Sequence, residues 1–244
     1  MEGEGKVKNA FLLAAVFLLG CFLLTPGNAL AFIIDDNYVG ADDHGWGDVI
    51  GDPDQYGIDW MDVEITDGSL NVAIRTYYDG TNHGINGLKR GALFISTDGW
   101  NPYGVAPYRD DNAYVKGERW EYAFDLYDQK LYEIGLDDVL LSDAAMAEAD
   151  GSWIYRNGQE VGITGGTYVN GGSVTYRGDD NMLFLSINLG GLDWNLGDLG
   201  FHYASATCGN DVIEGAAPVP EPATMLLMGI GLLGLGVVGR KRLK

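Results

Sequence analysis

Carboxylates crowd one stretch of this sequence and could bind a cation there. Residues 35–67 include eleven acidic side chains and no Lys or Arg. Negative charges this close together repel one another unless solvent, salt or a bound cation offsets them, and Ca²⁺ accepts irregular cages of oxygen ligands. We therefore expect a calcium site in this stretch, and aspartates that only form turns are the alternative. The candidate ligands are Asp42, Asp43, Asp48, Asp52 and Asp54.

An EF-hand is excluded within the same stretch. The run from Asp52 to Gly57 begins like an EF-hand loop, but Tyr56 stands at the fifth ligand position. Val63 occupies the place where such loops carry a bidentate glutamate. Any calcium site here must therefore be irregular.

An aromatic loop at residues 99–108 is the candidate for binding a glycan. Aromatic rings on the loops of β-proteins stack on sugar rings, and polar neighbours hydrogen-bond to sugar hydroxyls. The candidate contacts are Trp100, Tyr103 and Tyr108. The alternative is that these rings fill one end of the hydrophobic core.

Catalytic residues are not grouped in any familiar pattern. The histidines His44, His83 and His202 have neither metal-ligand nor catalytic-triad spacing. Glu118 and Glu121 are candidates for the carboxylate pair of a glycosidase, but residues three apart on a continuous strand point to opposite faces. The sequence therefore predicts a protein that is not an enzyme, with a glycoside hydrolase as the weakest alternative.

The charge of the chain limits its partners. Its 244 residues carry a formal net charge of −20. Such an acidic surface repels phosphate backbones and anionic lipid headgroups. We expect no nucleic-acid partner and no membrane binding through basic patches.

The candidate sites lie between short runs rich in β-branched and aromatic residues. In one run Leu70, Val72 and Ile74 alternate with polar or small residues, which is typical of a strand with one buried face. The 37 glycines and the many short runs favour a mainly β fold. We predict an antiparallel two-sheet β-sandwich, of which the jelly roll is one form. The expected strands are 70–78, 92–97, 120–126, 131–134, 153–155, 160–163, 173–177 and 182–189.

Two local signals interrupt these strands. Asn157-Gly158 between two β-type runs predicts a tight hairpin turn. Residues 137–149, with an alanine-rich centre, are the one expected helix.

The N-terminus has the form of a secretory signal. Basic residues precede an apolar run at 10–24, and the small residues Ala29 and Ala31 precede an expected cleavage site. We predict a signal peptide over 1–31 that signal peptidase removes, so that the mature chain begins at Phe32. The alternative is a lipoprotein acylated at Cys21. Without the signal, Cys208 is the single cysteine, and no internal disulfide can form.

The C-terminus has three ordered parts. Pro220, Glu221 and Pro222 are followed by an uncharged apolar stretch at 223–239 and a basic cluster at 240–244. A short apolar span before a basic cluster is typical of a single membrane helix whose tail stays in the cytoplasm. The same three parts in this order resemble the PEP-CTERM sorting signal.

This resemblance implies a processing route. It implies that Pro220, Glu221 and Pro222 are recognised by an integral-membrane exosortase, which cuts near the motif. The helix would then anchor the chain in the inner membrane only transiently, before transfer to the outer surface or extracellular matrix of a cell that makes exopolysaccharide. An unprocessed membrane anchor is the alternative. The expected organisation is a signal peptide (1–31), a β-sandwich domain (32–217) and a sorting signal (218–244).

Taken together, these patterns predict a non-catalytic exported protein of the cell surface or extracellular matrix. An exosortase and signal peptidase are its expected partners, with exopolysaccharide as a third. The alternative function is a calcium-assisted, lectin-like module that binds carbohydrate.

Overall fold

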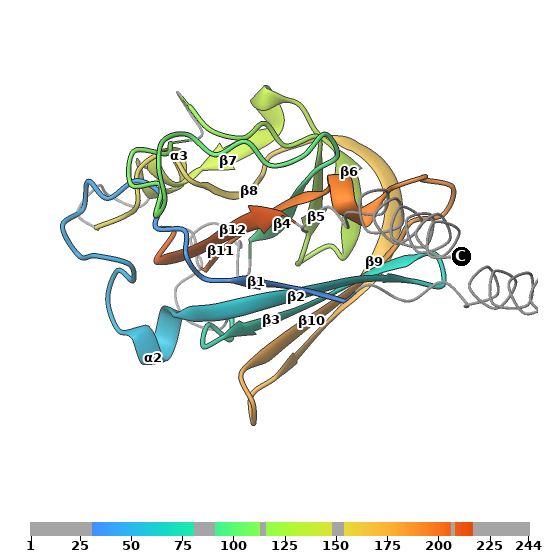
Figure 1. Cartoon of the computed structure of the whole chain (residues 1–244), viewed down its shortest axis with the longest axis horizontal. Helices are drawn as coiled ribbons and strands as arrows, with labels where there is room; N and C mark the ends of the chain where they lie inside the picture. Colours follow the sequence, from blue (N-terminus) through green and yellow to red (C-terminus); the bar gives the residue numbers. More distant parts are fainter. Residues whose placement is uncertain (1–30, 81–90, 113–115, 148–153, 206–207, 217–244) are drawn as a thin grey trace, which may run out of the picture. The chain divides into compact units, whose positions relative to one another are not determined.

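The computed structural model describes residues 31–80, 91–112, 116–147, 154–205 and 208–216. Within these residues the chain is mainly β, and the strand pairings are antiparallel (Figure 1). Ten strands form one large sheet. In order across that sheet they are β1 (Phe32–Asp35), β2 (Ile58–Thr66), β3 (Ser69–Thr76), β10 (Met182–Asn188), β9 (Thr167–Arg177), β6 (Lys130–Glu133), β5 (Tyr122–Asp125), β4 (Ala92–Ser96), β11 (Gly200–Ser205) and β12 (Asp211–Ala216).

The remaining described elements are short. β7 (Val139–Leu141) and β8 (Glu160–Ile163) form a separate two-stranded sheet. Two α-helices, α2 (Pro53–Tyr56) and α3 (Ser142–Ala147), have one or two turns each. Two 3₁₀ turns cover Leu136–Asp138 and Leu196–Asp198.

Strand β9 joins two halves of the large sheet. Its residues 172–177 pair with β10, whereas its residues 167–171 pair with β6. At this junction a Cβ added to Gly172 would lie 2.5 Å from the carbonyl oxygen of Ser186 and 2.8 Å from the Phe124 ring, so the close approach requires glycine. The curve of β9 around one side of the sheet is plain in Figure 1. The prediction of an antiparallel β fold is therefore confirmed, but the two expected sheets are halves of one continuous sheet.

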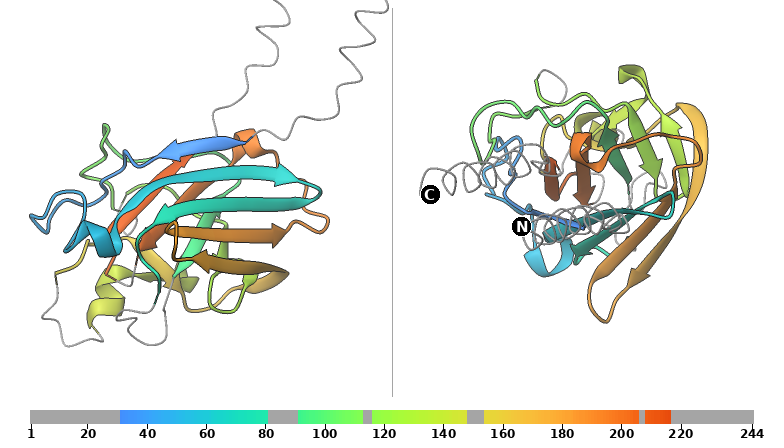
Figure 2. Two further views of the ribbon diagram at one scale, coloured as in Figure 1. Left: turned by 90° about the horizontal axis from the view of Figure 1, so that it is seen from below. Right: turned by 45° about the vertical axis from the view of Figure 1, so that its right-hand side comes forward.

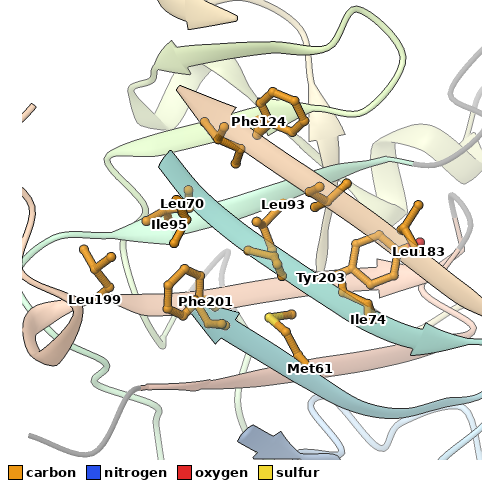
Figure 3. Packing of buried hydrophobic residues seen from close by; sticks show 14 of the residues in the cluster. Met61, Leu70, Ile74, Leu93, Ile95, Phe124, Leu183, Leu199, Phe201 and Tyr203 are labelled. Atoms are coloured by element: carbon orange, nitrogen blue, oxygen red, sulfur yellow. The ribbon is translucent and has the colours of Figure 1, made fainter. Parts of the chain in front are cut away.

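The hydrophobic core lies between these two halves. Met61 and Ile74 come from the first half, and Leu93 and Phe201 come from the second half; all four are fully buried (Figure 3). Along β3 burial alternates residue by residue, as the hydrophobic pattern of Leu70, Val72 and Ile74 predicted.

The last strand returns to the first two. Asp211, at the start of β12, accepts a hydrogen bond at 2.6 Å from the backbone N–H of Ile58 in β2. Near the other end of β12, a Cβ added to Gly215 would lie 2.7 Å from Ile34 Cγ2 in β1. The two outermost strands of the large sheet therefore lie close together.

The expected elements were correct where the hydrophobic pattern was strong. Seven of the eight expected strands overlap β3, β4, β5, β6, β8, β9 and β10. The expected strand at 153–155 was wrong, because Ile154 and Tyr155 are not in a strand and Trp153 lies outside the described residues. Asn157 and Gly158 form a turn, but it does not join two paired strands. The expected helix is reduced to α3, since residues 136–141 form a 3₁₀ turn and β7.

Both ends of the chain lie outside the described residues. These include Ala29, the motif Pro220, Glu221 and Pro222, and the apolar stretch at 223–239. Among the residues that the structure describes, no helix is long and apolar enough to cross a membrane. Ala31, the last residue of the expected signal peptide, is described and exposed, and β1 begins at the next residue.

Candidate functional site

Three carboxylates from separate parts of the chain meet beside the first and last strands. Asp36 follows β1, Asp48 lies in the loop before α2, and Asp211 begins β12. One oxygen of each carboxylate lies within 4.8 Å of the others. We call these three residues the Asp cluster.

The backbone orients only one of these carboxylates. Asp211 is buried and accepts hydrogen bonds from the N–H groups of Ile58 at 2.6 Å and Val212 at 2.9 Å. By contrast, Oδ1 of Asp36 is buried and has no hydrogen-bond partner among the described residues. An acceptor left without a donor in the interior is costly, so the Asp cluster is incomplete as a hydrogen-bonded structure.

The electrostatics of the Asp cluster favour a neutralising species. Burial, followed by repulsion between the carboxylates, raises the pKa values of Asp36 and Asp211 well above the usual range. Among the described residues, no Lys, Arg or His forms an ion pair with any of the three carboxylates. Three convergent carboxylate oxygens are ligands that a hard cation such as Ca²⁺ prefers.

Arg156 is the cation nearest to the cluster, but its hydrogen bonds go elsewhere. Its side chain is fully buried. Its guanidinium donates to the carbonyl oxygens of Val39, Asp48 and Gly209, the last at 3.1 Å from Nε. Nη2 also lies 3.4 Å from the carbonyl oxygen of Asn210. Arg156 therefore connects three backbone segments by hydrogen bonds. Its positive charge partly offsets the negative charge of the Asp cluster without forming an ion pair with it.

The five residues expected as calcium ligands do not come together in the structure. Of the five candidates only Asp48 belongs to the Asp cluster. Asp42 pairs with Arg109, and Asp52 caps α2 by accepting a hydrogen bond from the N–H of Asp54. Asp43 and Asp54 are exposed. Asp36 and Asp211 were not among the predicted ligands. Asp211 lies at the far end of the domain in sequence, so no local pattern links it to the acidic stretch.

Two rings of the aromatic loop pack against other side chains, although no residue of the loop is fully buried. Trp100 Nε1 donates to Glu214 Oε1 at 2.6 Å, and its ring meets that of Tyr108 edge-on at a centroid distance of 5.3 Å. Tyr108 also packs against Tyr38, which is buried. Tyr103 is the exposed member, and the ammonium group of Lys116 lies 4.2 Å from its ring centroid. Trp100 and Tyr108 are therefore half-buried and packed against other side chains, whereas Tyr103 is exposed.

A second buried polar group lies on the outer side of β11. His202, fully buried, places Nδ1 3.0 Å from Glu214 Oε2 and Nε2 2.8 Å from the carbonyl oxygen of Glu160. Trp120 Nε1 donates to Glu160 Oε1 at 2.8 Å. Burial raises the pKa of Glu160 to about 7, and nearby His202 opposes that rise. We call Glu160, His202 and Glu214 the Glu-His-Glu group.

The Glu-His-Glu group is closed rather than open to a substrate. Its three side chains are nearly or wholly inaccessible. Its carboxylate oxygens accept hydrogen bonds from two tryptophans, Trp100 and Trp120. A general acid or base must be within reach of its substrate. The Glu-His-Glu group is not, so we assign it a structural role in the interior of the domain.

The other candidates for catalysis are dispersed. Glu118 accepts from the N–H groups of Asn101 at 2.5 Å and Arg119 at 2.8 Å, while Glu121 accepts from the N–H of Thr97 at 2.9 Å. His44 accepts from the N–H of Trp46 at 3.1 Å, and His83 lies outside the described residues. Both glutamates therefore hold loops by hydrogen bonds to the backbone.

Cys208 is not an activated thiol. Its side chain is mostly buried, and burial raises the pKa of the thiol to about 11. The thiolate is the form of cysteine that acts as a nucleophile or metal ligand. Because the thiol of Cys208 stays neutral, its reactivity is low.

Comparison with known proteins identifies the C-terminal segment. The PEP-CTERM protein-sorting motif matches residues 218–242. No curated protein and no solved structure matches the chain. The match covers the tail and does not extend into the β domain. It confirms the resemblance found in the sequence: the chain is a protein that carries a PEP-CTERM sorting motif, and this motif supports sorting by an exosortase and export to the cell envelope.

Proposed function

We propose that the chain is a non-catalytic protein of the outer cell surface or extracellular matrix, which an exosortase delivers and which acts with exopolysaccharide. The signal peptide (1–31) brings it to the membrane, and the apolar stretch (223–239) holds it there until the motif is processed. The β domain is the part that remains at the surface.

The observation that carries this proposal is the sorting motif at residues 218–242. Such a motif suits a protein that is exported to the cell surface and has no use in an intracellular enzyme. The interior of the β domain supports a binding or structural role, because the carboxylates of Glu118, Glu121, Glu160 and Glu214 all accept hydrogen bonds within the domain. None of them remains as an evident acid or base facing a substrate.

Calcium-assisted carbohydrate binding is the second candidate function. The Asp cluster favours the calcium part, since three carboxylates converge there within 4.8 Å. A glycoside hydrolase has less support, because Glu118 and Glu121 are engaged by separate backbone segments.

Cell fractionation tests the main proposal. The full chain is produced in a host that makes exopolysaccharide and carries an exosortase, and in the same host without its exosortase gene. With the exosortase we expect a shortened product in the surface or matrix fraction. Without it we expect a longer form in the inner-membrane fraction. A membrane-bound product of the same size in both hosts would contradict the proposal and leave the tail as a permanent anchor.

A further inference from the structure

A shallow polar groove lies on the outer face of the first half of the large sheet. It has a volume of about 310 Å³, and β2, β3, β10 and β9 all contribute to it. The left view of Figure 2 looks onto this face, where the four strands lie side by side. The groove is on the side of the strands opposite the core, since its residues alternate with buried ones such as Met61 and Val63.

Strand register arranges the groove in two rows that cross all four strands. The first row consists of Asp62, Ala73, Phe184 and Thr175. The second row consists of Glu64, Asn71, Ser186 and Ser173. Because neighbouring strands are about 4.8 Å apart, each row spans roughly 14 Å. The groove therefore has the length of a short oligosaccharide rather than of one small ion.

The groups in these rows are those that hydrogen-bond to hydroxyls. The second row carries a carboxylate, an amide and two hydroxyls side by side, and Ser186 Oγ donates to Asn71 Oδ1 at 2.9 Å. That bond occupies the amide oxygen and leaves the amide N–H groups for another acceptor. In the first row, Asp62 Oδ1 is buried and has no hydrogen-bond partner among the described residues. Rotation of the Asp62 carboxylate would bring this oxygen to a donor in the groove.

Charge restricts what can lie in the groove. Asp62 and Glu64 are its two ionisable groups, and neither forms an ion pair within the described part of the chain. The two arginines beside the first row are already engaged. Arg75 pairs with Asp59 at 2.7 Å, and Arg177 pairs with Asp180 at 2.8 Å and lies 4.3 Å from the Phe184 ring centroid. An acidic ligand would therefore be repelled, whereas a chain of neutral hydroxyls would donate to both carboxylates.

We propose that this groove binds a short stretch of a polysaccharide that carries no acidic groups. The carboxylates of Asp62 and Glu64 accept hydrogen bonds from sugar hydroxyls. Along the second row Asn71 and Ser173 supply donors, while Ser186, whose O–H already donates to Asn71, offers its oxygen as an acceptor. An aromatic side chain is also available at one end, since Trp60 lies two residues before Asp62 on the same face of β2. The inference rests on the proposed function, in which the protein acts with exopolysaccharide. It assigns the binding of that polysaccharide to this groove instead of the aromatic loop.

The test is binding of oligosaccharides to the full chain purified in mild detergent. The probes are neutral hexasaccharides of glucose, mannose and galactose, with an oligouronate of equal length as the acidic probe. The variants are Glu64→Gln and Ser186→Ala in the second row and Asp62→Asn in the first. Glu133→Gln is the matched control, because Glu133 is exposed on β6 outside the groove. Thermal melting shows that each variant is folded.

We expect at least one neutral probe to bind and the acidic probe not to bind. Glu64→Gln and Ser186→Ala should each weaken binding about tenfold, with Glu133→Gln unchanged. The proposal is overturned if no neutral hexasaccharide binds, if the oligouronate binds equally well, or if Glu64→Gln and the control behave alike. If Asp62→Asn fails to fold, the variants Glu64→Gln and Ser186→Ala still test whether the groove binds the oligosaccharide. The binding test uses purified protein and needs no exosortase. A negative binding result would therefore not contradict exosortase sorting, and a negative fractionation result would not affect the binding test.

Discussion

His202 and Glu214 are cross-strand partners in β11 and β12, and Nδ1 of the imidazole lies 3.0 Å from Oε2 of the carboxylate. The imidazole is fully buried in this pair. Burial alone would lower the pKa of His202, but its hydrogen bond to Glu214 and the charges of both glutamates raise it instead. The pair therefore couples the protonation of the interior to the folding of the domain.

Stability should increase on mild acidification when no divalent cation is present. The pKa of Glu160 rises on folding from 4.5 to about 7, and that of Asp111 rises from 3.8 to about 6, in both cases chiefly through burial. The folded chain thus binds these protons more tightly than the unfolded chain, so the free energy of unfolding falls as pH increases from about 5 to 7. His202 acts in the same direction, because its stabilising charge is lost as pH rises through its raised pKa. We expect calorimetry in chelator to give a melting temperature several degrees higher at pH 5.5 than at pH 8.

A variant of Glu160 isolates the cause of this pH dependence. Glu160→Gln keeps an acceptor for Trp120 but needs no proton, so the slope of melting temperature against pH should become smaller. For wild-type Glu160, a pKa change of this size corresponds to about 3 kcal/mol across the range. The exposed control Glu133→Gln should retain the wild-type slope. A melting temperature that is highest at pH 8 in chelator would show that these groups are not protonated in the folded chain.

Replacing Arg156 should destabilise the domain strongly. Arg156→Lys keeps the charge but cannot donate simultaneously to the carbonyl oxygens of Val39, Asp48 and Gly209. Buried acceptors are then left unpaired, at a cost of about 3 kcal/mol or more in the free energy of unfolding. Arg177→Lys, whose side chain is half exposed, should change it by about 0.5 kcal/mol at most. Urea unfolding measures both, and equal effects of the two substitutions would contradict the role assigned to Arg156.

Calcium should raise the melting temperature of the full chain in detergent, and magnesium should do so less. A ligand that binds only the folded state at 100 times its Kd adds about 2.7 kcal/mol. Asp36→Asn should abolish this response and also raise the melting temperature in chelator, because it removes a carboxyl whose charged form is disfavoured in the folded state, first by burial and then by the neighbouring carboxylates. Asp54→Asn is the control, since Asp54 is exposed on α2 away from the Asp cluster. If chelator and calcium give the same transition in the wild type, the Asp cluster is not a calcium site.

Replacing Glu221 should stop processing without stopping export. Membrane insertion and orientation depend on the apolar stretch at 223–239 and the basic cluster at 240–244, neither of which Glu221→Ala alters. In a host with an exosortase, fractionation should therefore find the variant full-length in the membrane and the wild type shortened at the surface. If both forms are shortened alike, the protease does not read Pro220-Glu221-Pro222.

The mature chain should begin at Phe32. Ala29 and Ala31 supply the small side chains that signal peptidase requires, and β1 starts at Phe32. Mass spectrometry of the exported product measures this terminus directly. An N-terminal lipid on Cys21 would instead identify a lipoprotein.

The parts of the fold that sequence could predict are those with a local pattern. The alternation of Leu70, Val72 and Ile74 gave β3 correctly, because one buried face imposes a period of two. Strands β11 and β12 are buried on both faces, so their residues do not alternate and their individual bounds were not predicted. The fold-over at β9 depends on contacts such as that between Gly172 and the Phe124 ring, which are remote in sequence.

The candidate site shows the same division. The acidic stretch contains Asp36 and Asp48, but composition cannot say which of its many aspartates come close together in the fold. Asp211 joins the Asp cluster only because β12 returns to β2. Trp100 was a candidate for sugar stacking because its ring lies in a loop, and the sequence gives no sign of its hydrogen bond to Glu214, which holds the half-buried ring in place.

The contact between the first and last strands has a consequence for the timing of folding. A chain made from its N-terminus produces β1 first and β12 last, and about 180 residues separate Ile34 from Gly215, which meet in the finished domain. The Asp cluster spans the same interval, since Asp36 and Asp211 come from its two ends. Neither the contact between β1 and β12 nor the Asp cluster can form in a partly synthesised chain. These contacts therefore form only after nearly all of the domain has been made.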